Sequence, residues 1–332
     1  MNIVLKVLLF FIFLGLGYGY NYFINRDVEF NNLGVKFYEQ AKYEDAISQY
    51  DKALELKPKE SLYNYNKGVA LFYLKDYNRA LVSFDNAIKY ENKKENIILS
   101  DNYSKRGATY YELFKDKEAL EDIDKALSLD SNNLWGLYYK TMLTASNKNY
   151  TGALSYIDKY INLDKTNPDA YSIKGDILYY IGETEKSNSS YLKSLELNNN
   201  SYLVNFSVAT NYFMLSDYKS ALKYYKNALK IEPNNYLNSF YVGYTLYKLG
   251  EFDDALKYFD KSYLLEGGKN DHLVKMYKLY LLDKLNNKKE LGLFLDDNYK
   301  GINIADIKGL LEIFEKKGYL EFKEALEIYK LK

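Results

Sequence analysis

The sequence predicts an all-α fold in which antiparallel helix pairs stack side by side into a solenoid. Subtracting residue numbers shows a small residue recurring every 34 residues, with one interval of 39, and a second, mostly Ala series in step about twelve residues later. A repeat of this length corresponds to one helix–turn–helix unit. The first series is Gly34, Gly68, Gly107, Thr141, Gly175, Ala209 and Gly243. The second is Ala46, Ala80, Ala119, Ala153, Ser187, Ala221 and Ala255.

Residues 1–24 are almost wholly apolar, with Lys6 as their one charged side chain. A membrane-spanning helix needs about 20 apolar residues, and this run just reaches that length. We expect a single-pass membrane anchor, with Lys6 and the amino terminus in the cytoplasm and the repeats outside it. Two alternatives stay open. One is a cleaved signal peptide with its core at Val7–Leu16 and its cut near Gly17 or Gly19, followed by export; the other is a buried cap helix.

Seven repeat units are expected within residues 27–267. Their eighth and twentieth positions are the two small-residue series, which let two antiparallel helices approach closely. Larger apolar residues at the eleventh and twenty-fourth positions, such as Phe37 and Tyr50, give each helix one apolar stripe. All three Pro residues fall at unit boundaries, where Pro ends one helix and starts the next. The units start near residues 27, 61, 100, 134, 168, 202 and 236.

Two features interrupt this rhythm. The long interval places extra residues between the second and third units, within Glu91–Ser100. We expect a tolerated loop insertion there, with a local binding feature as the alternative. Thr141, Ser187 and Ser194 depart from the small or apolar pattern, so the fourth and fifth units are expected to form softer joints.

The repeat fades after Gly268. Residues 270–332 are expected to hold a degenerate eighth unit followed by amphipathic helices rich in Lys and Glu. Such helices are typical of a cap that closes the open end of a repeat stack. The alternative is a separate bundle that docks a partner.

This pattern resembles the tetratricopeptide repeat (TPR) family, whose unit has small residues at positions eight and twenty and Pro near thirty-two. Gly34, Phe37, Ala46, Tyr50 and Pro58 match it in the first unit, and the resemblance covers residues 27–267. It implies a right-handed superhelix of helix pairs. It also implies that the first helix of each unit lines a concave groove and that the protein binds partners rather than catalyses a reaction.

Many groove positions implied by the resemblance are aromatic. An aromatic-lined groove suits an extended peptide or a docked helix, because Tyr and Trp offer a large contact area at low entropy cost. The alternative is that a chain with 39 Tyr residues places Tyr everywhere and that some of these rings pack between units. The predicted groove residues are Tyr65, Phe72, Tyr73, Tyr111, Trp135, Tyr138, Tyr179, Tyr180, Phe206, Phe213, Phe240, Tyr244 and Tyr247, with Trp135 as the main candidate.

Some family members grip a partner's terminal carboxylate with Lys and Asn side chains from three consecutive units. Asn66 and Lys105 stand at two of the five corresponding positions, whereas Asn31, Val35 and Asp101 do not fit. The partial match argues against this mode of binding.

The chain lacks most of the residues that common catalytic sites need. It has no Cys, and its only His is His272, so thiol chemistry, His-rich metal sites and Ser–His–Asp arrangements are excluded or unsupported. A calcium-loop resemblance from Asp296 fails because Ile307 stands where a carboxylate is required. With 45 basic and 45 acidic side chains and few Arg, no nucleic-acid partner is expected. We expect no cofactor, no metal and no enzymatic activity.

The sequence therefore predicts a non-enzymatic scaffold that binds a peptide or protein partner in an aromatic-lined groove and is tethered to a membrane. The alternative is a cell-envelope protein that binds glycan or peptidoglycan, since aromatic rings can stack on sugars. The abundance of Tyr, Asn, Lys and Ile suggests AT-rich coding and favours a bacterial source.

Overall fold

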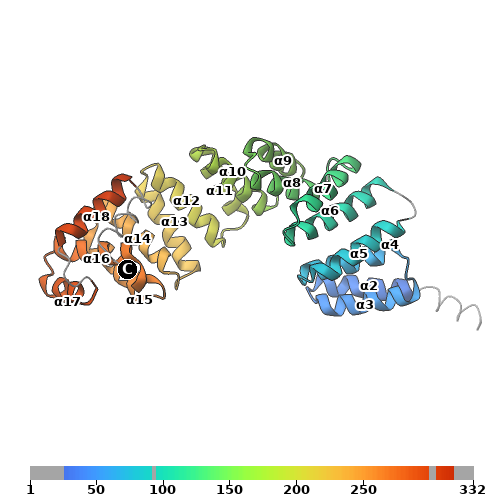
Figure 1. The fold of residues 1–332 in the computed structure, drawn as a ribbon, viewed down its shortest axis with the longest axis horizontal. Coiled ribbons are helices and arrows are strands. Elements are labelled where there is room, and N and C mark those ends of the chain that lie inside the picture. Colours follow the sequence, from blue (N-terminus) through green and yellow to red (C-terminus); the bar gives the residue numbers. More distant parts are fainter. Residues whose placement is uncertain (1–25, 92–94, 299–303, 318–332) are drawn as a thin grey trace, which may run out of the picture. The chain divides into compact units, whose positions relative to one another are not determined.

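The computed structural model describes residues 26–91, 95–298 and 304–317, and every regular element within these ranges is a helix. Successive helices form pairs, and within each compact part of the chain these pairs pack on one another (Figure 1). The predicted all-α solenoid is therefore confirmed. The chain divides into two compact units, with the boundary between Lys165 and Thr166.

The N-terminal unit consists of helix pairs joined by turns of a few residues. Side-chain caps start several of these helices; for example, Asn133 accepts a hydrogen bond from the backbone N–H of Gly136. The pairs are α2 (Arg26–Glu39) with α3 (Tyr43–Leu56), α4 (Ser61–Tyr73) with α5 (Tyr77–Tyr90), α6 (Asn96–Glu112) with α7 (Asp116–Leu129), and α8 (Leu134–Ser146) with α9 (Tyr150–Leu163).

The C-terminal unit begins in the same way and ends less regularly. Its pairs are α10 (Pro168–Tyr180) with α11 (Thr184–Leu197), α12 (Tyr202–Met214) with α13 (Tyr218–Ile231), and α14 (Tyr236–Leu249) with α15 (Phe252–Leu264). A short 3-10 turn, η1 (Gly268–Asn270), leads to α16 (His272–Lys284), α17 (Lys288–Asn298) and α18 (Ile304–Lys317).

The small residue at the eighth position of each repeat leaves room for the large side chain at the twenty-fourth position of the same repeat. A Cβ atom added to Gly34 would lie 2.5 Å from the ring of Tyr50, and one added to Gly68 would lie 2.8 Å from the ring of Phe84. Real Cβ contacts are essentially never this short. The ring of one helix therefore packs directly on the backbone of the other, which holds the two helices of a pair close together.

Two of the polar departures in the fourth and fifth repeat units, Thr141 and Ser187, are satisfied by hydrogen bonds. Thr141 Oγ1 donates to the backbone oxygen of Leu137 at 2.8 Å. Ser187 Oγ donates to the backbone oxygen of Gly175 at 2.8 Å and accepts from Asn211 Nδ2 at 3.0 Å. Because these hydroxyls are buried, each bond removes a desolvation penalty. Ser187 also joins both helices of its own pair to the next pair.

The insertion precedes a longer first helix in the third pair. Arg106 fixes α6 to both neighbouring second helices. Its Nε and Nη2 donate to the carboxylate of Asp122 at 2.7 and 2.8 Å, and its Nη1 donates to Asp85 at 2.7 Å. A bidentate guanidinium–carboxylate pair is directional, so it sets the orientation of α6 against α7.

Most turns within the pairs contain a residue in the left-handed region of backbone conformation, and it is usually not Gly. Phe114, in the turn between α6 and α7, has φ 57° and is 93% exposed. A side chain in this region costs about 1–2 kcal/mol, which Gly avoids. Phe114→Gly is therefore expected to stabilise the protein by about 0.5–1 kcal/mol, after the greater unfolded-state freedom of Gly is subtracted.

Thermal unfolding followed by circular dichroism would measure this gain. Phe114→Ala keeps the strained backbone while removing the same exposed ring, so it should leave the midpoint nearly unchanged. Equal shifts in both variants would attribute the effect to the ring and not to the backbone.

None of the helices that the structure describes is long and apolar enough to cross a membrane. The anchor expected at residues 1–24 lies outside the described residues.

Candidate functional site

The predicted groove residues of the N-terminal unit differ in exposure. Phe72 is buried with 9% of its surface exposed, whereas its neighbour Tyr73 is 41% exposed. The remaining members, Tyr65, Tyr111, Trp135 and Tyr138, are half-buried. The structure thus divides the set into a packing residue and several rings that keep an accessible face.

Trp135 lies at the centre of an aromatic cluster that joins α4 and α8. Phe72 packs against it in a T-shaped arrangement at 5.6 Å between ring centroids, and Tyr139 stacks on it at 5.6 Å with an interplanar angle of 18°. Tyr111 and Tyr138 each contact Tyr139 in turn, at 5.4 and 5.3 Å. Trp135 is therefore mainly a packing residue, although it is half-buried and keeps part of its surface exposed.

Lys105 of α6 completes this cluster. Its Nζ lies 3.0 Å from the centroid of the Trp135 ring, and the residue is only 8% exposed. Burial lowers the pKa of Lys105 to about 7, and the charge of Asp101 opposes that shift. A cation over an indole face is attracted by the ring quadrupole, which partly offsets the loss of hydration.

A second group of rings lies nearer the amino end of this unit. Tyr73 stacks on Tyr43 at 5.7 Å with an interplanar angle of 18°, and Tyr38 contacts both at 5.7 Å. Burial, followed by the neighbouring Tyr73, raises the pKa of Tyr38. We call Tyr38, Tyr43 and Tyr73 the tyrosine triad. Sequence reasoning selected Tyr73 alone, although Tyr38 stands at the twelfth position of the first unit, which is also a groove position.

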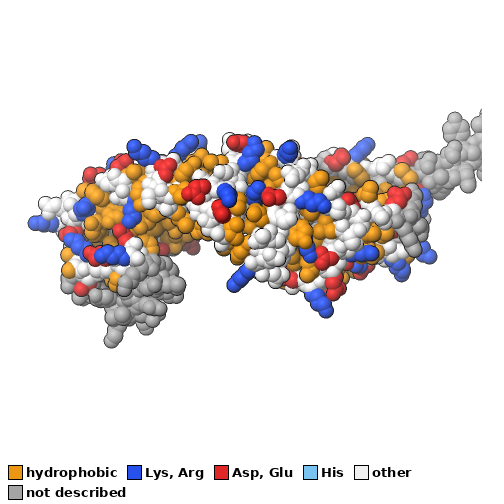
Figure 2. Space-filling view, turned by 90° about the horizontal axis from the view of Figure 1, so that it is seen from above, with side chains coloured by type: hydrophobic (Ala, Val, Ile, Leu, Met, Phe, Trp, Pro, Cys, Tyr) orange, Lys and Arg blue, Asp and Glu red, His pale blue; other side chains and the backbone are white. Residues whose placement is uncertain are grey.

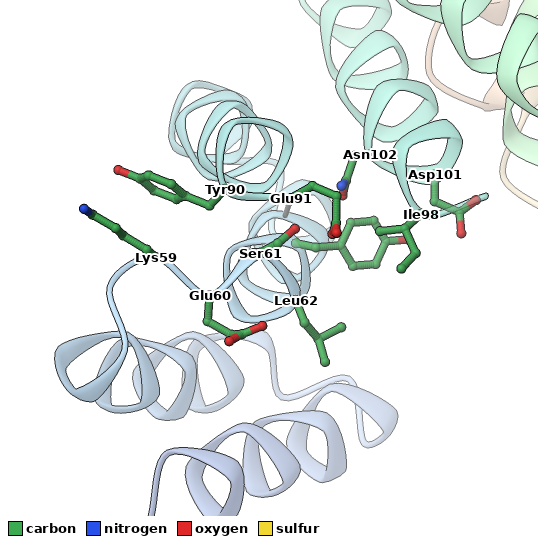
Figure 3. Close-up of a pocket in the computed structure, with 10 residues that line it drawn as sticks. Lys59, Glu60, Ser61, Leu62, Tyr90, Glu91, Ile98, Asp101 and Asn102 are labelled. Atoms are coloured by element: carbon green, nitrogen blue, oxygen red, sulfur yellow. The ribbon is translucent and has the colours of Figure 1, made fainter. Parts of the chain in front are cut away.

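A pocket of about 470 Å³ opens beside the insertion, where α4, α5 and α6 meet (Figure 3). It combines apolar walls with charged groups of both signs. Asn102 is 1% exposed, and neither Oδ1 nor Nδ2 of its amide has a hydrogen-bond partner. The lining residues are Lys59, Glu60, Ser61, Leu62, Tyr65, Tyr90, Glu91, Ile98, Asp101 and Asn102. The insertion therefore borders a cavity large enough to hold a partner's side chain.

The two residues at carboxylate-gripping positions are engaged within the chain. Asn66 Nδ2 donates to Asn31 Oδ1 at 2.9 Å, and Lys105 faces Trp135. Asn66 is thus hydrogen-bonded, and the Lys105 ammonium lies against an indole ring.

The predicted residues of the C-terminal unit fall into similar classes. Tyr179 and Tyr180 are 38% and 67% exposed, whereas Phe240 and Tyr244 are 4% and 8% exposed. The half-buried members are Phe206, Phe213 and Tyr247. Phe213 packs against Tyr244 at 5.1 Å, so these rings of α12 and α14 are brought together.

No group of three or more His, Asp or Glu side chains within the described residues could hold a metal ion. Lys and Arg side chains are interspersed with Asp and Glu on the face of the molecule drawn in Figure 2. That face therefore presents no block of one charge to a polyanion.

Comparisons with known proteins agree with this architecture. Residues 31–95 and 209–271 match one tetratricopeptide repeat family model, and residues 100–133 match a second. A TPR repeat-containing protein of Methanocaldococcus jannaschii is 26% identical over 215 residues, which cover 61% of this chain and 38% of that protein. The Hsp70-Hsp90 organising protein of Plasmodium falciparum is 31% identical over 101 residues, 30% of this chain and 18% of that one. This chain thus spans less than half the length of these curated relatives.

Solved structures share the fold at low sequence identity. The C-terminal part of a TPR repeat-containing protein from Cytophaga hutchinsonii has a TM-score of 0.54 and 20% identity, covering 73% of this chain and 97% of that one. YrrB, described as a TPR protein with an unusual peptide-binding site, has a TM-score of 0.50 and 21% identity, covering 61% and 97%. The repeat spacing, the helix pairs and the family models agree that the chain carries tetratricopeptide repeats, matched at residues 31–95, 100–133 and 209–271.

Proposed function

We propose that this chain is a non-enzymatic scaffold that binds a peptide or protein partner along the first helices of its pairs. Proteins of this family generally mediate protein–protein interactions. The observation that carries the proposal for this chain is the row of partly exposed rings on α2, α4, α6 and α8. Tyr38 and Tyr73, together with the exposed part of Trp135, offer rigid apolar surface with hydroxyl and N–H groups at its edge.

Replacing these rings should weaken partner capture. We expect Trp135→Ala/Tyr138→Ala and Tyr38→Ala/Tyr73→Ala each to reduce recovery of a specific partner by about tenfold or more, since aromatic anchors contribute about 2 kcal/mol or more. Crosslinking in intact cells, affinity purification of the full chain and quantitative mass spectrometry would measure it.

Phe114→Ala is the matched control, because it removes an exposed ring from a turn and not from a first helix. Recovery should stay at the wild-type level in this variant. Equal recovery of every partner by all the variants would contradict the assignment of the binding surface.

We further propose that residues 1–24 tether the scaffold to a membrane and leave the repeats outside the cytoplasm. The apolar run of about spanning length supports this. Membrane fractionation with an alkaline wash should leave the chain in the pellet, and a mass measurement of the amino-terminal peptide should show it intact. A soluble chain beginning near residue 20 would show a cleaved signal and export instead.

A second candidate is binding of cell-envelope glycan, favoured by the stacked rings of Tyr43 and Tyr73 and the exposed rings of Tyr179 and Tyr180. Sedimentation with purified cell wall separates the two functions. Saturable sedimentation that Tyr73→Ala abolishes would support glycan binding.

A further inference from the structure

Helix α18 is amphipathic and packs alongside α16 (Figure 1). Ile307, Leu310 and Leu311 are 0%, 1% and 5% exposed, and Phe314 continues the same stripe. Relative to Ile307, the others lie three, four and seven residues further on, the spacing of one helix face. One side of α18 is therefore buried against other helices of the C-terminal unit.

That surface includes two predicted groove residues. The ring of Phe314 lies 6.1 Å from Tyr244 of α14 and 6.3 Å from Tyr277 of α16. Tyr247, one turn along from Tyr244, stacks on it at 6.2 Å and borders the same seam. We call Tyr244, Tyr247, Lys248, Tyr277 and Tyr280 the α14–α16 surface.

Polar contacts at both ends of the stripe fix how α18 lies. Glu315 receives Lys248 Nζ at 3.1 Å on one oxygen and the hydroxyl of Tyr277 at 3.1 Å on the other. Lys308 Nζ lies 2.7 Å from the carboxylate of Asp283. These contacts favour a helix that carries a carboxylate directly after the apolar stripe, as at Glu315, and a basic side chain within the stripe, as at Lys308.

The last helices of the unit are built differently from the regular pairs. Tyr277 stands 34 residues after Gly243, where the other units have a small residue. Its ring packs back against the preceding pair, stacked on Phe259 at 5.3 Å with an angle of 9°. A pocket of about 340 Å³ remains between Tyr247 and Tyr280 on one side and Leu311 and Glu312 on the other. An open cleft, lined largely by charged side chains, thus runs along the seam beside α18.

We propose that the α14–α16 surface is a helix-binding site that α18 occupies within its own chain. Its external ligand is an amphipathic partner helix with the α18 pattern, in which apolar residues take the places of Ile307, Leu310, Leu311 and Phe314 and an acid takes that of Glu315. Contacts at helical spacing, with two ion pairs at the margins, fit a helix better than an extended peptide. The bound fraction of α18 lowers the partner's apparent affinity, so release of α18 regulates the site.

This inference rests on the proposed scaffold function in one respect, because its site also includes the first helix of a pair, α14. It can be tested with purified protein alone. The probe is a fluorescent peptide with the sequence of residues 304–317, added to the full chain. We expect weak binding to the wild type and binding at least about tenfold tighter to Leu310→Asp/Leu311→Asp, in which α18 cannot dock. A peptide carrying the same two substitutions should bind neither protein.

A second variant keeps the apolar stripe intact. Lys308→Glu/Glu315→Lys reverses the charges of both ion pairs of α18 and should also admit the wild-type peptide. The further change Lys248→Glu should weaken the binding of that peptide again.

Failure of both variants to bind the peptide, while circular dichroism shows them folded, would overturn the proposal. A wild-type dimer that dissociates on dilution and is lost in Leu310→Asp/Leu311→Asp would also overturn it, since α18 would then serve a second copy of the chain. Retained peptide binding in Trp135→Ala/Tyr138→Ala separates this site from the proposed N-terminal surface.

Discussion

Gly175→Ala is expected to destabilise the C-terminal unit by about 1–3 kcal/mol, although Ala is the better helix former. The added Cβ would lie 2.5 Å from the ring of Tyr191, which is 3% exposed and has little room to move. The ring is also held by its hydroxyl, which donates to Asp176 Oδ1 at 2.6 Å. Any shift that relieves the contact therefore disturbs this hydrogen bond and the packing of α10 on α11.

The matched control is Gly292→Ala in α17, where a Cβ would meet nothing within 4 Å. That substitution should stabilise by about 0.5–1 kcal/mol through helix propensity alone. Because repeat arrays can unfold in parts, hydrogen exchange of α10 and α11 should accompany the thermal melt. A Gly175→Ala protein that melts no lower than the wild type, beside a stabilised Gly292→Ala, would show that Tyr191 moves freely.

The fold class could be predicted from the sequence because the spacing of small residues is a property of single helix pairs. Gly68 and Phe84 lie in the same repeat unit, and their contact depends only on the local helix–turn–helix geometry. The hydrogen bonds of Ser187 were not predictable in the same way. The hydroxyl that departs from the Ala pattern has its partners in both its own pair and the next.

The exposure of each predicted groove residue could not be predicted, because it depends on side chains from other repeat units. Phe72 and Tyr73 are adjacent in sequence, yet one packs against Trp135 and the other joins the tyrosine triad. Position in the repeat assigns both rings to the first-helix face, but it does not show what a neighbouring helix places over them.

The C-terminal helices show the same limit. Tyr277 at a small-residue position indicates that the last pair is irregular, and the Lys and Glu content of α18 suggests a cap. Neither feature reveals that Glu315 reaches Lys248, since that contact joins residues far apart in sequence.

Lys105→Met is expected to stabilise the N-terminal unit by about 1–4 kcal/mol at pH 6, the range seen when buried charges give way to apolar groups of similar size. Lys105 is only 8% exposed, and its Nζ has no hydrogen bond or ion pair in the described part of the chain. Met keeps the length of the stem and can contact Trp135 through its sulfur. The lost cation–π attraction, about 2 kcal/mol for a desolvated pair, sets the lower end of the range.

The pH dependence supplies a second readout with a defined sign. Burial lowers the pKa of Lys105 to about 7 in the folded chain, against 10.5 for the free side chain. Between about pH 7 and 10.5 the unfolded chain therefore binds the extra proton, so this group makes wild-type stability rise with pH across that window. Lys105→Met removes the effect, and its advantage over the wild type should be largest at pH 6 and shrink towards pH 9.5.

Urea unfolding at pH 6, 7.5 and 9.5 would measure both quantities, with Lys140→Met as the control. Lys140 is paired with Asp124, whose side chain is 54% exposed, so its loss should change stability by less than about 1 kcal/mol at each pH. Because Lys275 is half-buried and burial also lowers its pKa, the comparison must be variant against wild type and not between pH values alone. A Lys105→Met protein less stable than the wild type at every pH would mean that the Trp135 ring compensates the buried ammonium fully. Lys105 would then be a stabilising part of the aromatic cluster through its contact with the Trp135 ring.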